Sequence, residues 1–200
     1  MLISIKSIAI ITHVFFLTWL VTTFPMVNRL HQSLRYILLL LLILFMLFIP
    51  IYAGFTLVQL CRGILGDLSI TTLIILAMLL LKKLYSWPIV PINFAFAWIV
   101  VLSGLVLYLS TFGIIKTDIY ALGYYPKVLL ILFIVAELFL WRVSKLNAWL
   151  WLIAAVCFYF KLEESHNLWD YLFDPVLWVI AIAEIIKGRL YRNKFVKGAW

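Results

Sequence analysis

The chain has 200 residues, of which 67% are apolar or aromatic and only 12% are charged. A soluble domain carries about 25% charged residues. A chain of this size also leaves too many side chains facing solvent to hide so much apolar surface in one core. The composition therefore excludes a soluble enzyme, a disordered protein and a coiled coil. It indicates a bundle of membrane-spanning helices.

Seven apolar segments are candidates for these helices, because a helix needs about 20 apolar residues to cross a bilayer core. In chain order they are Ile8–Phe24, Tyr36–Leu60, Ile64–Leu81, Pro88–Phe112, Tyr120–Trp141, Leu146–Phe160 and Pro175–Ile186. The first follows Lys6 as in a signal peptide, but no small-residue cleavage site follows it, so we expect an uncleaved span. The sequence predicts an all-α, polytopic integral membrane bundle of six to seven transmembrane spans, in a single domain over residues 1–200.

The charges separate between alternate connections. The net charge is +8, from sixteen Lys and Arg against eight Asp and Glu. Residues 26–35, 82–83 and 142–145 and the tail 187–200 are basic, whereas the connections between them are balanced or acidic. The positive-inside rule places the tail in the cytoplasm of a bacterial inner-membrane protein, against anionic lipid rather than nucleic acid. The outer face then holds His166 and most of the acidic residues, which are Asp67, Asp118, Glu163, Glu164, Asp170 and Asp174.

The densest polar stretch, residues 163–175, carries four acidic residues and one histidine. A helix beginning at Asn167 would lie in the membrane interface, with Asp170 and Asp174 on its polar side. Asp174 also precedes Pro175, so it is expected to cap the last span.

Two interpretations of these polar residues stay open. Glu163, His166 and Asp170 could meet Asp118 at the outer mouth of the bundle, where they would hold a lipid headgroup or a divalent cation. Alternatively, they are solvated loop charges and helix caps. Their spacing matches no metal-ligand motif, so we predict no metal site and no cofactor.

Other polar candidates lie in the remaining outer connections and inside the spans. Arg62 and Asp67 could form an ion pair, or hold a lipid phosphate and a hydroxyl group. Tyr120 belongs to a tyrosine-rich run that is typical of an interfacial aromatic belt. His13 and Glu137 are ionisable groups within predicted spans, where such groups are costly. Glu137 is interpreted either as part of a proton path or as a neutral group bonded to another helix.

The segment Arg62-Gly-Ile-Leu-Gly-Asp-Leu-Ser69, followed by two spans and then Asp118-Ile-Tyr120, resembles the membrane module of lipoteichoic-acid-synthase-like, sulfatase-fold envelope transferases. Those modules enter a span through a Gly-Leu-Arg-Phe-Asp-Leu-Ser-like sequence and carry an Asp-Ile-Glu-Tyr-like loop. The order of Arg and Gly differs here, and the catalytic extracellular domain is absent from this sequence. The resemblance implies a role in envelope polymer or lipid modification without catalysis by this chain, and it transfers no catalytic residue.

We therefore expect a non-catalytic or accessory protein of cell-envelope lipid or polymer biogenesis. Its outer face would bind a lipid headgroup or a partner membrane protein through Arg62, Asp67, Asp118, Tyr120, Glu163, His166, Asp170 and Asp174. One alternative is an integral-membrane enzyme acting on a lipid-linked substrate, whose acid–base groups would be Asp67, Asp118, His166 and Asp170. Another is a small transporter with His13 and Glu137 along its path.

Overall fold

The structure is a computed structural model that describes residues 2–197, with the side chains of residues 7–125, 127 and 129–189. Its helices are α1 (Leu2–Thr23), α2 (Pro25–Arg29), α3 (Gln32–Phe48), α4 (Leu57–Leu65), α5 (Ile70–Tyr85), α6 (Phe94–Thr111), η1 (Tyr120–Gly123), α7 (Pro126–Val143), α8 (Lys145–Tyr159), α9 (Leu168–Leu172) and α10 (Pro175–Lys197). The strands β1 (Pro50–Tyr52) and β2 (Phe55–Thr56) pair into a short antiparallel hairpin. The prediction of an all-α chain is confirmed, because the hairpin is a minor part of the described residues.

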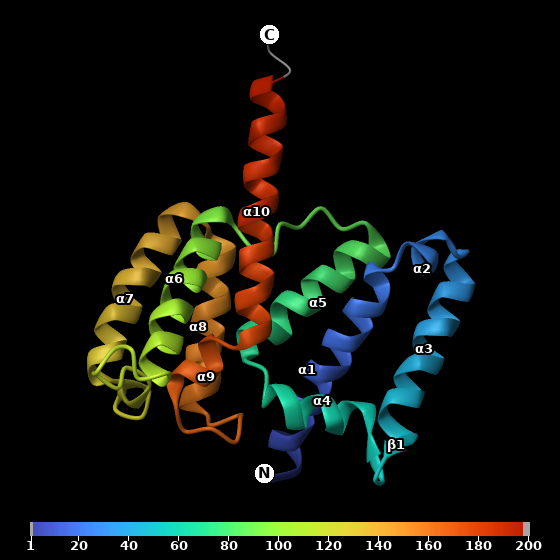
Figure 1. The fold of residues 1–200 in the computed structure, drawn as a ribbon, viewed down its shortest axis with the longest axis horizontal. Helices are drawn as coiled ribbons and strands as arrows, with labels where there is room; N and C mark the ends of the chain where they lie inside the picture. The colour runs from blue at the N-terminus through green and yellow to red at the C-terminus, as the bar shows by residue number, and fades with distance from the viewer. Residues whose placement is uncertain (1, 198–200) are drawn as a thin grey trace.

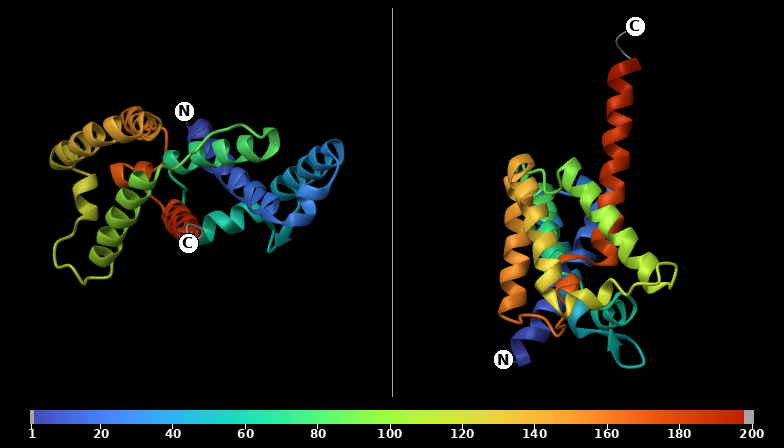
Figure 2. Two further views of the ribbon diagram at one scale, coloured as in Figure 1. Left: turned by 90° about the horizontal axis from the view of Figure 1, so that it is seen from above. Right: turned by 90° about the vertical axis from the view of Figure 1, so that its left-hand side faces the viewer.

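The long helices α1, α3, α5, α6, α7, α8 and α10 run alternately in opposite directions (Figures 1 and 2). Their connections gather at two ends of the molecule. The hairpin end, at the bottom of Figure 1, carries the β1–β2 hairpin, α4, η1 and α9. The opposite end, here called the tail end, carries α2 and the C-terminal part of α10. The helix pairs that pack together most extensively are α6 with α10 and α1 with α5.

The prediction of one continuous span over Tyr36–Leu60 is wrong. Helix α3 ends at Phe48, and Pro50 then begins β1, because proline has no backbone N–H to continue a helix. Ala53 and Gly54 have positive φ angles of 49° and 82°, as two-residue hairpin turns require. The chain then enters α4, whose first turn is held by a capping box between Thr56 and Gln59.

Two other helices begin later than predicted. Each begins directly after a residue whose side chain caps it. Helix α5 begins at Ile70 rather than Ile64, because Ser69 accepts a hydrogen bond from the backbone N–H of Thr72. Likewise, α6 begins at Phe94 rather than Pro88, after the N-cap residue Asn93.

The last helix is longer than the predicted segment Pro175–Ile186. Helix α10 continues through the first part of the basic tail as far as Lys197. The tail aromatic residues Tyr191, Phe195 and Trp200, and the expected contact of this tail with anionic lipid, lie outside the described side chains.

By length and composition, six to seven spans are not supported. Among the described residues, α6 is the one helix long and apolar enough to cross a bilayer, with a mean hydropathy of 2.0. Helices α3 (Gln32–Phe48) and α8 (Lys145–Tyr159) are apolar but shorter than 18 residues, as is Ser7–Thr23, the part of α1 whose side chains the structure describes. Helix α7 has the length, but it includes Lys127, Glu137 and Arg142.

The main core lies between α5, α6, α7, α8, α9 and α10. Trp151 on α8 is its aromatic centre, with ring centroids 5.3 Å from Phe96, 6.1 Å from Phe133 and 5.4 Å from Phe173. A smaller core cluster joins α1, α3 and α4. The outward surface is also apolar, since α7 exposes Ile131, Leu132, Ile134, Val135, Leu138 and Phe139.

Gly104 allows α6 and α10 to approach closely. A Cβ atom at this position would lie 2.4 Å from Cδ1 of Trp178, whose indole Nε1 donates a hydrogen bond to the Val101 carbonyl at 3.0 Å. We expect Gly104→Ala to lower the free energy of unfolding by about 1–3 kcal/mol, because it overpacks this contact. Thermal unfolding of the detergent-purified chain measures this.

Gly63→Ala is the matched control. Gly63 lies on α4, and a Cβ atom added there would meet no atom of another element within 4 Å, so alanine should leave stability unchanged or slightly raised. Equal melting temperatures for Gly104→Ala and Gly63→Ala would contradict this account of the α6–α10 contact.

Candidate functional site

The candidate site lies at the hairpin end, where η1, α9 and the first turns of α5 and α10 meet. The sequence builds these turns locally. The Asn167 side chain caps α9 by accepting a hydrogen bond from the Trp169 N–H. Asp174 caps α10, since its Oδ1 accepts the Leu177 N–H at 2.8 Å. The Asp174 cap agrees with the sequence prediction.

Asp174 also joins α10 to α5. Its Oδ2 atom accepts hydrogen bonds from the Ser69 backbone N–H at 2.9 Å, from the Ser69 hydroxyl at 2.6 Å and from the Thr72 hydroxyl. A further bond runs from the Thr71 hydroxyl to the Tyr171 carbonyl at 3.2 Å. The start of α5 is thereby fixed to both α9 and α10.

Asp170 joins α9 to η1. Its two carboxylate oxygens lie 2.9 Å and 2.8 Å from the Tyr120 hydroxyl, and the Ser165 hydroxyl donates to Oδ2 at 2.5 Å. Burial raises the pKa of Asp170, while the hydrogen bonds from Ser165 and Tyr120 lower it. Gly123 lets the two segments approach, because a Cβ atom there would lie 1.7 Å from Oδ1 of Asn167.

Glu163 is a buried carboxyl group near this site, with 7% of the residue exposed. Its Oε1 atom has no hydrogen-bond partner among the described residues. Burial, together with the negative charges of Asp170, Asp67 and Asp174, raises the pKa of Glu163 to about 9. A hydrogen bond with the Ile70 backbone acts in the opposite direction and lowers the pKa. Glu163 is therefore a neutral carboxylic acid at pH 7.

A group of ion pairs, formed by Arg62 with Asp67 and Glu164, lies at the rim of the candidate site. Arg62 donates to Asp67 through Nε at 2.5 Å and through Nη2 at 2.9 Å, and it lies 3.2 Å from Glu164. These hydrogen bonds raise the pKa of Arg62 despite partial burial. The predicted Arg62–Asp67 ion pair is confirmed, and its bidentate geometry fixes the end of α4 relative to the start of α5.

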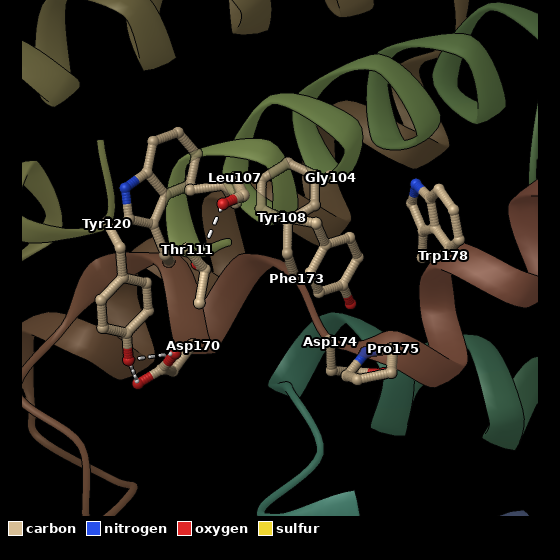
Figure 3. A pocket seen from close by; sticks show the side chains of 11 residues that line it. Gly104, Leu107, Tyr108, Thr111, Tyr120, Asp170, Phe173, Asp174, Pro175 and Trp178 are labelled. Atoms are coloured by element: carbon tan, nitrogen blue, oxygen red, sulfur yellow. Dashed lines mark hydrogen bonds between the residues drawn. The ribbon is translucent and has the colours of Figure 1, made fainter. Parts of the chain in front are cut away.

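A cavity of about 170 Å³ opens between α6, η1, α9 and the start of α10 (Figure 3). Its polar lining residues include Asp170, Tyr120, Asp174 and Thr111. Its walls are largely aromatic and consist of Tyr108, Trp169, Phe173 and Trp178. Carboxylates on an aromatic wall are suited to a cationic group rather than to an anion.

The structure brings only some of the predicted residues together. Asp170, Tyr120 and Asp174 share the cavity, and Glu163 lies within their electrostatic reach. Asp118 is exposed, and its Oδ1 accepts the Ala121 N–H at 3.0 Å in the turn that leads into η1, outside the cavity. His166 is also exposed. The described residues contain no group of three or more His, Cys, Asp or Glu placed to hold a metal ion.

The two ionisable residues that were predicted to lie within spans are far from each other. His13 is buried on α1, with Nδ1 2.7 Å from the Ala9 carbonyl and no described partner for Nε2. Glu137 is buried on α7, and neither of its carboxylate oxygens has a described hydrogen-bond partner. Helices α1 and α7 are separated by other helices in both Figure 1 and Figure 2, so the two residues do not line one path.

Sequence reasoning missed several residues of the site. Ser165, Tyr171 and Thr72 bond to partners in other elements, and Tyr108 and Trp178 form cavity walls. The spacing of Ser69 and Thr72 at a helix start was the one local signal, because it is typical of a cap.

Comparison of the chain with protein-family models, curated proteins and solved structures finds no match.

The buried Glu163 makes stability depend on pH. Between its ordinary pKa of 4.5 and its folded pKa of about 9, the folded state keeps a proton that the unfolded state loses, so stability falls as the pH rises. We expect Glu163→Gln to stabilise the chain at pH 8 by on the order of 1–3 kcal/mol. The variant and the wild type should unfold alike at pH 4.

Thermal unfolding across this pH range measures the effect. Glu164→Gln is the control, because Glu164 is exposed and pairs with Arg62 at the rim. A Glu163→Gln variant that keeps the wild-type dependence of melting temperature on pH would contradict the assignment.

Proposed function

We propose that this chain is a multi-pass protein of the bacterial inner membrane with six to seven spans and its tail end in the cytoplasm. The alternating long helices and their exposed apolar side chains support this placement (Figure 1). A soluble protein rarely exposes such large contiguous apolar areas. Helices α5 and α8 are short for spans, but each lies beside a longer helix. The neighbouring helices can therefore cover the backbone polar groups at the ends of α5 and α8.

Charge segregation supports the orientation. The elements that meet at the tail end carry eight described basic residues, Arg29, Arg35, Lys82, Lys83, Arg142, Lys145, Lys187 and Arg189, against four at the hairpin end, Arg62, Lys116, Lys127 and Lys161. The acidic residues gather at the hairpin end, apart from Glu137 and Glu184. The positive-inside rule assigns the basic end to the cytoplasm and the hairpin end to the outer face.

At the outer face, the proposed role is non-catalytic binding of the ammonium group of a lipid headgroup, in the service of envelope lipid or polymer biogenesis. The observation that carries this proposal is the Tyr120–Asp170 contact at the wall of the 170 Å³ aromatic cavity. Aromatic faces and carboxylates together recognise substituted ammonium ions.

The geometry gives less support to the alternatives. An enzyme using Asp67, Asp118, His166 and Asp170 would need these groups together, but Asp118 and His166 are exposed and outside the cavity. A transport path lined by His13 and Glu137 would need their helices to meet. Binding without turnover is therefore the proposal that the site supports best.

Asp170→Asn tests this proposal. Asparagine keeps the size of the side chain and an acceptor for the Tyr120 hydroxyl, but it removes the negative charge. We expect roughly tenfold weaker binding of phosphatidylethanolamine, because one charge-assisted contact is lost. Native mass spectrometry of the detergent-purified chain, titrated with this lipid, measures the change.

Asp118→Asn is the matched control, since it removes a carboxylate from the same end but outside the cavity, and it should bind as the wild type does. Phosphatidylglycerol, which has no amine, should bind the wild type and Asp170→Asn equally at this end. An unchanged affinity for phosphatidylethanolamine in a folded Asp170→Asn variant would contradict the proposal.

A further inference from the structure

A second polar cavity lies at the tail end, between α1, α5 and α10. Its volume is about 470 Å³. The charged residues around it are Lys82 and Lys83 from α5 and Glu184 and Lys187 from α10. Trp19 from α1 forms part of its wall. It is separate from the aromatic cavity, which opens at the hairpin end.

The charge of this cavity is unbalanced. The Lys187 ammonium group lies 2.6 Å from Glu184 Oε1, so this carboxylate already has a partner. Lys82 and Lys83 form no ion pair with any described residue, although both line the cavity. The positive charges of Lys83 and Lys187 also repel each other. An anion placed between the lysines would relieve this repulsion.

The rest of the lining indicates what kind of anion fits. Leu79 and Ile180 form an apolar part of the cavity wall. An indole at this depth is typical of the membrane interface, and Trp19 supplies one. Lysine is a compact charge that binds phosphate without a fixed geometry. A phosphate group attached to an apolar body therefore matches the lining better than a small hydrophilic anion does.

We propose that this cavity binds a phosphate group, and that its source is an anionic phospholipid of the cytoplasmic leaflet. The phosphate lies between Lys82, Lys83 and Lys187, with the glycerol and the first part of the acyl chains against the apolar wall. The site is formed by three packed helices, and Lys187 is the one residue that it takes from the basic tail 187–200. It rests on the proposed function for the placement of the chain in a membrane and for the orientation of the tail end toward the cytoplasm.

The double variant Lys82→Gln/Lys83→Gln tests the site in the full chain. Arg142→Gln/Lys145→Gln is the control, because it removes two exposed positive charges from the same end, outside the cavity. The detergent-purified proteins are titrated separately with phosphatidylglycerol and with inorganic phosphate, and binding is followed by native mass spectrometry. Thermal unfolding shows whether each variant is folded.

We expect the Lys82/Lys83 double variant to bind phosphatidylglycerol roughly tenfold more weakly than the wild type, and the control to bind as the wild type does. Inorganic phosphate that binds as tightly as the lipid, with the same loss in the double variant, would overturn the lipid source and leave a site for free phosphate. Equal effects of both double variants would overturn the site itself. The Asp170→Asn result is independent of all these outcomes.

Discussion

The carboxylate of Asp174 joins the first turns of two helices whose contacts are 105 residues apart in the chain, and the architecture of the hairpin end depends on it. A buried carboxylate is costly unless several donors satisfy it. Here the backbone N–H and hydroxyl of Ser69, the Thr72 hydroxyl and the Leu177 N–H all donate to it. The caps of α5 and α10 are thus one shared network, so neither helix can move without leaving donors unpaired.

This network positions the residues of the proposed site. Residue 174 is separated from the end of α9 by Phe173 alone, so fixing the start of α10 also fixes α9, whose Asp170 then reaches Tyr120 on η1. The aromatic cavity is the space left between these elements and α6 (Figure 3). At their opposite ends, α5 and α10 line a cavity with Lys82 and Lys83, which form no ion pair with a described residue, beside the paired Glu184 and Lys187. The two proposed ligands, an ammonium group outside and a phosphate group inside, follow from this separation of charge along the bundle.

Local signals in the sequence predicted part of this structure. The capping roles of Asp174 and Asn167 could be predicted because a cap depends on residues within one helical turn. The hairpin at Pro50 was missed because an apolar run hides a turn whose main marks are one proline and one glycine. The partnership of Asp174 with Thr72 could not be predicted, since nothing local relates two residues that meet only through tertiary packing. The burial of Glu163 has the same origin, because its neighbours come from other elements.

Site-directed labelling measures the central claim, that the hairpin end faces outward and the tail end faces the cytoplasm. In a background with Cys61 and Cys157 replaced by serine, single cysteines are introduced at two exposed positions, His166→Cys at the hairpin end and Lys145→Cys at the tail end. A membrane-impermeant maleimide applied to intact cells should modify the cysteine at position 166, and should modify the one at 145 only after permeabilisation. The reverse pattern, or modification of both only after permeabilisation, would contradict the account.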